Sequence, residues 1–109
     1  MNDRQRIQRF IERFRGSENI FLHGCCYWFA RILDDQFSIR YGAEIMYEPI
    51  EGRFLTCIHG RYYDIRGDIS EEYRGKPMYI LSELRRENST IYRHLMRNCR
   101  DFEEVEDDD

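Results

Sequence analysis

The feature that most constrains the fold is the segment from residue 53 to residue 67, RFLTCIHGRYYDIRG. Two runs rich in β-branched and aromatic residues, 53–58 and 61–65, flank His59-Gly60, a two-residue link suited to a tight hairpin turn. Residues 43–47 show the same strand character. These segments together predict a small antiparallel sheet.

Segments with helical periodicity precede and follow the predicted strands in the sequence. Residues 3–15 carry apolar side chains at helical spacing, and a second helix is expected over 25–38. Because apolar residues cover much of its circumference, the second helix should be the central and most buried one. After an irregular connection, residues 78–86 predict a short helix or a strand and turn, and Ser89 is expected to cap a last helix. The sequence therefore predicts an α+β fold in which the central helix packs on the sheet, and an N-terminal and a C-terminal helix flank this core.

Length and charge divide the chain into one domain and a tail. A chain of 109 residues is long enough for one compact domain with one core and too short for two. Residues 101–109 hold seven of the 21 acidic residues and no base, which leaves 17 bases against 14 acids in residues 1–100. We expect a single α/β domain over 1–100 and a disordered acidic tail over 101–109, which solubilises the chain or mimics an anionic ligand or partner.

Several classes of protein are excluded by what the sequence lacks. No apolar run approaches the roughly 20 residues that cross a bilayer, and the N-terminus is not a signal peptide, so we expect a cytoplasmic protein with no membrane partner. The sequence has no glycine-rich phosphate loop of the Walker or dinucleotide type, no zinc finger, no RNA-recognition signature and no long basic stripe. It therefore predicts no cofactor and no direct binding of nucleic acid.

The four cysteines predict reduced thiols. Cys25 and Cys26 are adjacent, Cys57 lies among strand residues and Cys99 lies near the end of a helical pattern. This spacing matches neither a zinc site nor a disulfide framework, so no metal is expected. Cys57 and Cys99 are interpreted as packing residues.

Cys26 is the candidate nucleophile, because it stands where a loop becomes the central helix. The positive end of the helix dipole and the free N–H groups of the first turn favour a thiolate at such a position. Cys26 shares a helix face with Phe29, Ala30 and Leu33, so it should point toward the sheet, whereas Cys25 points elsewhere. The same spacing fits a small buried packing residue equally well.

The order of these motifs resembles the papain-like cysteine hydrolase superfamily in its small bacterial and phage forms, including NlpC/P60-like and transglutaminase-like domains. The resemblance spans residues 20–68 and rests on GCCYWFA at 24–30 and on the hairpin that ends in GRYYDIRG. It implies a papain-like core in which a cysteine begins the central helix, a histidine opens the next strand and a carboxylate on the following strand orients that histidine. By position, Cys26 matches the nucleophile, Asp64 matches the orienting carboxylate and Arg53 replaces the histidine.

Arg53 is a departure with chemical consequences, because a guanidinium stays protonated and cannot take the thiol proton. We therefore interpret the chain as a degenerate hydrolase, a pseudoenzyme whose pocket binds a ligand. The alternative is an active thiol hydrolase, a peptidase or amidase, in which His23 or His59 supplies the imidazole to Cys26.

The predicted pocket lies between the start of the Cys26 helix and the hairpin. Backbone N–H groups, a guanidinium and aromatic rings there would suit an anionic, aromatic-bearing ligand such as a nucleotide. The predicted ligand-binding residues are Cys26, Tyr27, Trp28, Arg53, Tyr62 and Tyr63. The resemblance to small phage and mobile-element domains implies a counter-defence role in the host cytoplasm, either capture of a nucleotide-derived signal or blockage of a host protein. The sequence leaves a homo-oligomer open.

Overall fold

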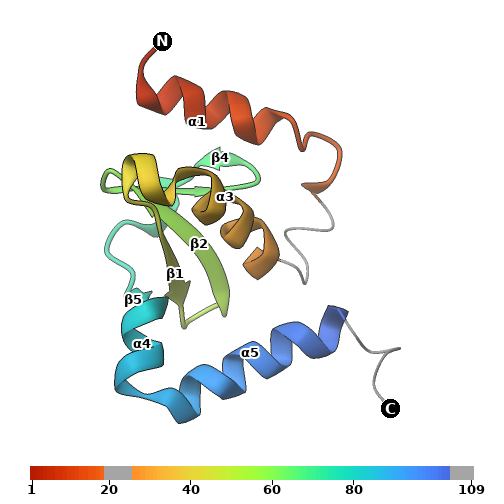
Figure 1. Ribbon diagram of the computed structural model, residues 1–109, viewed down its shortest axis with the longest axis vertical. Helices are drawn as coiled ribbons and strands as arrows, with labels where there is room; N and C mark the ends of the chain where they lie inside the picture. Colours follow the sequence, from red (N-terminus) through yellow and green to blue (C-terminus); the bar gives the residue numbers. More distant parts are fainter. Residues whose placement is uncertain (19–25, 104–109) are drawn as a thin grey trace.

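The computed structural model describes residues 1–18 and 26–103, with side chains described as far as residue 97. Within this part, five antiparallel strands form one sheet in the order β4-β3-β2-β1-β5, and helices lie along one face of the sheet and at both ends of the molecule (Figure 1). The elements are α1 (Asp3–Glu12), α3 (Cys26–Tyr41), β1 (Glu44–Glu48), β2 (Arg53–Ile58), β3 (Arg61–Asp64), β4 (Gly67–Asp68), η1 (Ser70–Tyr73), β5 (Tyr79–Ile80), α4 (Leu81–Glu87) and α5 (Ser89–Glu103). The predicted α+β class, with a central helix on an antiparallel sheet and flanking helices at both ends, is confirmed.

The central helix α3 packs on β2 through one apolar face. Phe29, Leu33 and Phe37, spaced four residues apart, are buried between the sheet and α1. The hydroxyl of Thr56 on β2 donates a hydrogen bond to the carbonyl oxygen of Ala30 at 3.0 Å, so the one fully buried hydroxyl at this contact is satisfied. The sheet thereby fixes both the position and the rotation of α3.

Two apolar clusters flank the middle of α3. The first joins α1 to α3, β2 and β3 through Ile7, Ile11, Phe29, Leu33, Phe37, Ala43, Ile58, Tyr63 and Ile65. The second joins the start of α3 to β2 and α4 through Tyr27, Ala30, Phe54 and Leu81, with Tyr92, Leu95 and Met96 of α5 packed against it. Helix α1 therefore lies along α3, whereas α5 lies beside the first turns of α3, and the two flanking helices are at opposite ends of the molecule (Figure 1).

Tight turns set the register of the sheet. His59 and Gly60 both have positive φ, 53° and 77°, which gives the hairpin geometry that the two-residue link predicted. In the β1–β2 turn, the buried carboxylate of Glu48 accepts hydrogen bonds from the N–H groups of Ile50 and Glu51 at 2.6 and 3.0 Å. The first turn thus depends on positive φ angles, and the second depends on hydrogen bonds to a buried carboxylate.

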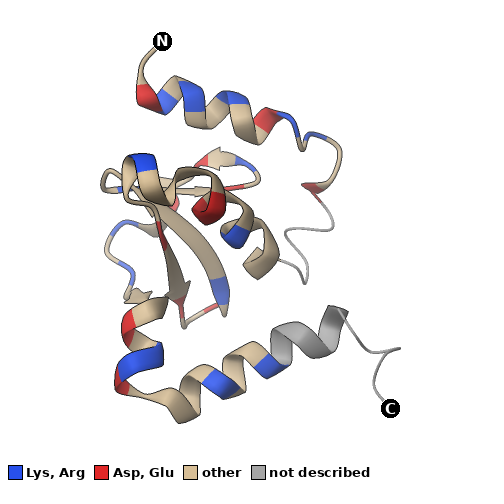
Figure 2. Ribbon diagram, viewed as in Figure 1, with Lys and Arg blue, Asp and Glu red and all other residues tan. Residues whose placement is uncertain are grey.

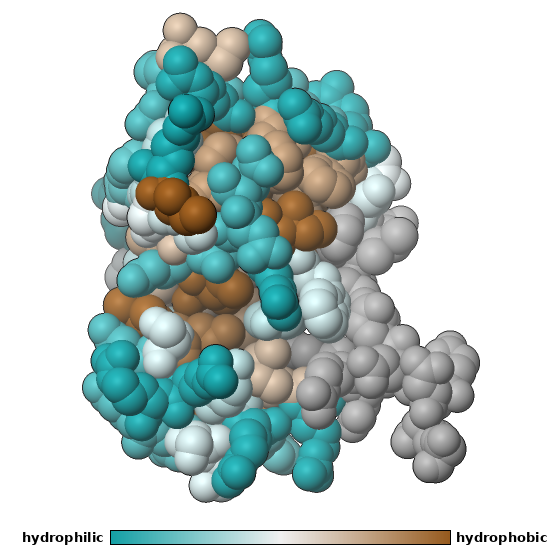
Figure 3. All heavy atoms as spheres, viewed as in Figure 1, coloured by the Kyte–Doolittle hydropathy of each residue, from teal (hydrophilic) through white to brown (hydrophobic). Residues whose placement is uncertain are grey.

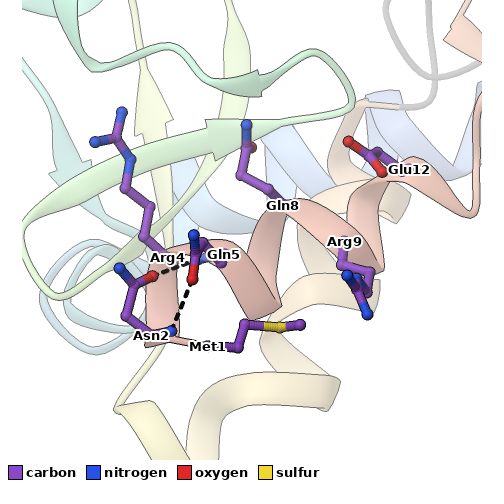
Figure 4. A pocket seen from close by; sticks show the side chains of 7 residues that line it. All are labelled: Met1, Asn2, Arg4, Gln5, Gln8, Arg9 and Glu12. Atoms are coloured by element: carbon purple, nitrogen blue, oxygen red, sulfur yellow. Dashed lines mark hydrogen bonds between the residues drawn. The ribbon is translucent and has the colours of Figure 1, made fainter.

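The ends of the flanking helices are capped by asparagines. Asn2 and Gln5 exchange hydrogen bonds of 2.8 and 3.0 Å in a capping box that begins α1 (Figure 4). At the start of α5 the side chain of Asn88, not that of Ser89, accepts the hydrogen bond from the N–H of Ile91 at 3.3 Å. The expected Ser89 cap is therefore wrong by one residue, because Asn88 has a non-helical backbone (φ −147°, ψ 75°) and precedes the helix, while Ser89 is already helical.

Helix α5 reaches Glu103, beyond the boundary at residue 100 that the charge pattern suggested. Residues 104–109 lie outside the described part of the chain. Among the described residues, none of the helices combines the length and the apolar character needed to cross a membrane.

Asp68 ties α1 to the sheet. Its Oδ2 lies 2.7 Å from Nε of Arg61 and 3.2 Å from Nη2 of Arg4 on α1. Burial raises the pKa of Asp68, but hydrogen bonds from Arg61 and Ser70 outweigh it, so the net pKa lies below its usual value. The ionised carboxylate is therefore the form that stabilises the fold.

The contribution of Asp68 to the stability of the protein should consequently depend on pH and be lost in acid. Because its pKa is lower in the folded state, the contribution of Asp68 is complete above its unfolded pKa of about 4 and is lost as the pH falls through the folded value. We expect Asp68→Asn to unfold at lower urea than wild type at pH 7, and the difference to shrink below about pH 4. Glu83→Gln, on the exposed side of α4, is the control. A difference that is constant with pH would contradict this assignment.

Candidate functional site

Cys26 is the first residue of α3 and is half-buried beside the start of β2. Its Sγ accepts a hydrogen bond from the backbone N–H of Phe54 at 3.5 Å. The thiol is thus at the helix start, as the sequence predicted, and it contacts the strand that follows the β1–β2 turn. Cys25 and His23 lie outside the described residues.

Arg53 begins β2, one residue before that contact. Along β2 the side chains of Phe54, Thr56 and Ile58 face α3, and strand alternation assigns Arg53 to the other face with Leu55 and Cys57. Nε of Arg53 lies 3.3 Å from Oε1 of Glu51. The side chains of Cys26 and Arg53 therefore start from opposite sides of the sheet.

Asp64 ends β3 and is almost completely buried. Its carboxylate accepts hydrogen bonds from the backbone N–H of Arg66 at 2.7 Å and from Nη2 of the same residue at 2.7 Å. Arg66 also reaches Glu72 at 3.1 Å, so it links the end of β3 to η1. In this structure the carboxylate orients a neighbouring arginine.

His59 lies at the far end of α3 from Cys26. Its ring is 5.3 Å from that of Tyr41, the last residue of α3, and its Nε2 is 3.3 Å from Oδ2 of Asp3. Cys26 and Tyr41 are separated by about 22 Å along the helix axis. The structure therefore does not bring His59 to the thiol.

The predicted aromatic residues separate into three environments. Tyr63 is buried in the core cluster next to α1, and Tyr62 shares the other face of the sheet with Cys57, its partner across the β2–β3 ladder. Burial raises the pKa of both phenols and also that of the Cys57 thiol. Tyr27 and Trp28, in contrast, lie in the first turn of α3 beside α5.

A groove runs between the first turns of α3 and helix α5, and we call it the α3–α5 groove. Its volume is about 450 Å³. It is lined by Tyr27, Trp28, Arg31, Tyr92, Arg93, Met96 and Arg97. The two helices that form it both carry arginines (Figure 2), and Arg31, Arg93 and Arg97 are exposed.

The three guanidinium groups of the α3–α5 groove have no acidic partner within 4.0 Å among the residues whose side chains are described. Three aromatic rings, those of Tyr27, Trp28 and Tyr92, line the same groove, and Tyr27 and Trp28 make an edge-to-face contact with ring centroids 5.2 Å apart. Guanidinium groups pair with phosphate or carboxylate, and aromatic faces stack on planar ligands. The groove therefore combines the two kinds of contact that the sequence had assigned to the Cys26–hairpin cleft.

A second cavity of about 450 Å³ continues on the other side of Tyr27, Arg31 and Tyr92, which line both spaces. It lies between α3, β1 and α4, where apolar side chains are visible between α3 and the two C-terminal helices (Figure 3). Its further lining residues are Asp34, Asp35, Ala43, Glu44, Ile45, Leu81, Ser82 and Arg85. We call it the acidic compartment.

The hollow of about 580 Å³ along α1 has a different character. It is formed by the helix and its cap alone, and its side chains diverge: Arg4 and Gln8 point toward the β3–β4 hairpin, whereas Met1 and Arg9 lie on the other side (Figure 4). Arg4 is engaged with Asp68, and Gln8 packs against Gly67. Because its polar groups do not converge, this hollow is not a candidate site.

The described residues offer no cluster of three histidine, cysteine or acidic side chains with the geometry of a metal site. The candidate site is therefore built from arginines, aromatic rings and carboxylates. Sequence reasoning found Tyr27 and Trp28 but missed Arg31, Tyr92, Arg93 and Arg97. The signal that could have found the last three is the amphipathic pattern of residues 89–103, in which arginines border an aromatic and aliphatic stripe.

Comparison with known proteins gives one result for nearly the whole chain. The model of the family described as Phage YunG-like protein matches residues 4–104, which include α1, α3, the sheet and the residues that line the α3–α5 groove and the acidic compartment. Comparisons with curated proteins and with solved structures gave no match. A match over this range shows the family, and the chain belongs to the Phage YunG-like proteins.

Proposed function

We propose that this phage-type protein is a non-catalytic binding protein that holds a nucleotide or nucleotide-derived signal in the α3–α5 groove. One observation carries the proposal: three arginines without an acidic partner among the described side chains line one groove together with three aromatic rings. Its volume of about 450 Å³ lies within the range of small-molecule sites.

The chemistry of the groove suits a phosphate joined to a planar base. Arginine forks bind phosphate oxygens in pairs, and this is stronger than a contact between neutral groups. Tyr27, Trp28 and Tyr92 supply ring faces and edges for the base. A ligand with a phosphate alone would contact only the arginines, and a ligand with a base alone would contact only the aromatic rings.

The biological role that we propose is sequestration in the host cytoplasm, where the protein removes a nucleotide-derived immune signal. Membership of a phage family supports this role by association. The papain-like resemblance supports an origin from a thiol hydrolase, with Cys26 retained at the helix start. A groove separate from the thiol explains why binding would proceed without turnover.

Isothermal titration calorimetry with the four ribonucleoside 5′-monophosphates tests the proposal. The double variant Arg93→Gln/Arg97→Gln should weaken the tightest of them by about tenfold or more, because two charge-assisted contacts are lost. Arg9→Gln/Arg13→Gln is the matched control, since these arginines have the same spacing at the end of α1, where Arg13 is the C-cap, and their replacement should leave the affinity unchanged. If none of the four binds to wild type, the proposal fails.

The same protein separates binding from catalysis. Ligand released by heat from the wild type and from Cys26→Ala should be recovered chemically intact and in equal amounts, which mass spectrometry measures. Conversion of the ligand by wild type but not by Cys26→Ala would establish the thiol hydrolase instead. A loss of affinity in Arg53→Gln, with no loss in the Arg93/Arg97 variant, would place the ligand at the Cys26–hairpin cleft.

A further inference from the structure

The acidic compartment differs from the α3–α5 groove in charge. Asp34 and Asp35 enter it from α3 and Glu44 enters it from β1, whereas the α3–α5 groove has no acidic lining residue among those described. The two spaces share Tyr27, Arg31 and Tyr92 as a common wall. A ligand that occupies both would therefore meet guanidinium groups without carboxylates in the α3–α5 groove, and three carboxylates beside Arg31 and Arg85 in the acidic compartment.

The carboxylates of the acidic compartment form no ion pair with the described side chains. None of its three carboxylates has a basic partner within 4.0 Å among the described side chains, although Arg31 and Arg85 line the same space. Cζ of Arg85 lies 5.6 Å from the ring centroid of Tyr92, where it contacts the aromatic face. The carboxylates are thus available to accept hydrogen bonds from a ligand.

Asp34 is the most enclosed of the three carboxylates. Burial raises its pKa, the negative charges of Asp35 and Glu44 raise it further, and Arg31 opposes them. The ionised form is therefore held there at a cost that the folded protein alone does not offset. Donors from a bound molecule would relieve this cost.

The remaining walls suit a flat ring. Ala43, Ile45 and Leu81 form apolar surface, and the two shared tyrosines stand at the entrance from the α3–α5 groove. Trp28 and Asp34 are separated by about 9 Å along α3, which is the scale of one nucleoside monophosphate. A phosphate beside Trp28 in the α3–α5 groove would leave its base at this compartment.

We infer that the acidic compartment receives the base of the nucleotide and that Asp34 selects guanine. This inference rests on the proposed function, because the phosphate must first be placed at the arginines. Guanine presents its ring N1–H and its exocyclic amine side by side, and the two oxygens of one carboxylate accept both. Adenine presents one amine next to a ring acceptor, which the carboxylate repels.

Calorimetric titration of wild type and Asp34→Asn with four probes tests the inference. The probes are guanosine, adenosine and xanthosine 5′-monophosphates and ribose 5-phosphate, which lacks a base. Wild type should bind the guanosine compound about tenfold tighter than the adenosine compound, the effect of one hydrogen bond to a charged group. Glu83→Gln on α4, outside both spaces, is the matched control and should keep this preference.

Asp34→Asn should change the preferred base from guanine to xanthine. Its affinity for the guanosine compound should fall by about tenfold, and its affinity for ribose 5-phosphate should not fall, because the loss concerns the base. Its affinity for the xanthosine compound should rise, since the amide N–H₂ can donate to the 2-carbonyl. A thermal melt verifies that the variant is folded.

The possible failures are distinguishable. Equal binding of the guanosine and adenosine compounds, unaffected by Asp34→Asn but weakened by Arg93→Gln/Arg97→Gln, would overturn the role of Asp34 and leave the proposed function standing. No binding of any probe to wild type would overturn both.

Discussion

Replacing Leu33 with alanine is expected to lower the free energy of unfolding by about 3 kcal/mol. Leu33 has no exposed surface and lies in the cluster where α3 meets the sheet and α1. Truncation removes buried methyl groups and leaves a cavity that three packed elements cannot readily fill. Urea unfolding followed by circular dichroism measures the change.

Ile39→Ala is the control on the same helix. Ile39 is 98% exposed, so its replacement removes no core contact and slightly favours the helix. We expect a change of less than about 0.5 kcal/mol. If the Leu33 variant were as stable as the Ile39 variant, α3 would not be the central helix of the core.

Removal of the Asp64 carboxylate should have an effect of similar size. Asp64→Ala removes a buried carboxylate that accepts hydrogen bonds from the backbone N–H and the side chain of Arg66, and because Arg66 is exposed and keeps Glu72 as a partner, the cost should be about 2 kcal/mol. Arg66→Met should be comparably harmful, since it leaves the carboxylate uncompensated. The free energy of unfolding of each variant gives the measurement.

The double variant Asp64→Ala/Arg66→Met distinguishes a structural pair from two independent sites. If the pair acts as a unit, the double variant should lose clearly less stability than the two single losses added together. Strict additivity would contradict the pairing. A stable Asp64→Ala variant that had lost a thiol-dependent reaction would instead return Asp64 to the role that the papain-like resemblance implies.

Most of the fold could be predicted because local chemistry and tertiary packing agree. The His59-Gly60 link specified the hairpin, and the apolar circumference of the segment after Cys25 marked it as the central helix. Residues 78–86 remained ambiguous because they form both a two-residue strand and a short helix. The cap of α5 was misplaced because Asn88 and Ser89 are both good capping residues.

The site was harder to predict than the fold. In β2, residues on both faces are buried, so apolar alternation could not tell which face Arg53 shares. The position of Arg93 and Arg97 depends on how α5 folds back toward α3, which no local pattern specifies. Tyr27 and Trp28 were found because they adjoin Cys26 in the sequence, although the site that they line is not the cleft predicted for them.

Both outer strands of the sheet, β4 and β5, are only two residues long. Each offers few unpaired backbone groups, so neither is a useful template for a strand from another chain. Edge-to-edge aggregation, a hazard for small sheets made in quantity, is thereby discouraged. Any protein that recognises this molecule must read its side chains, because the backbone at its margins has almost no strand to extend.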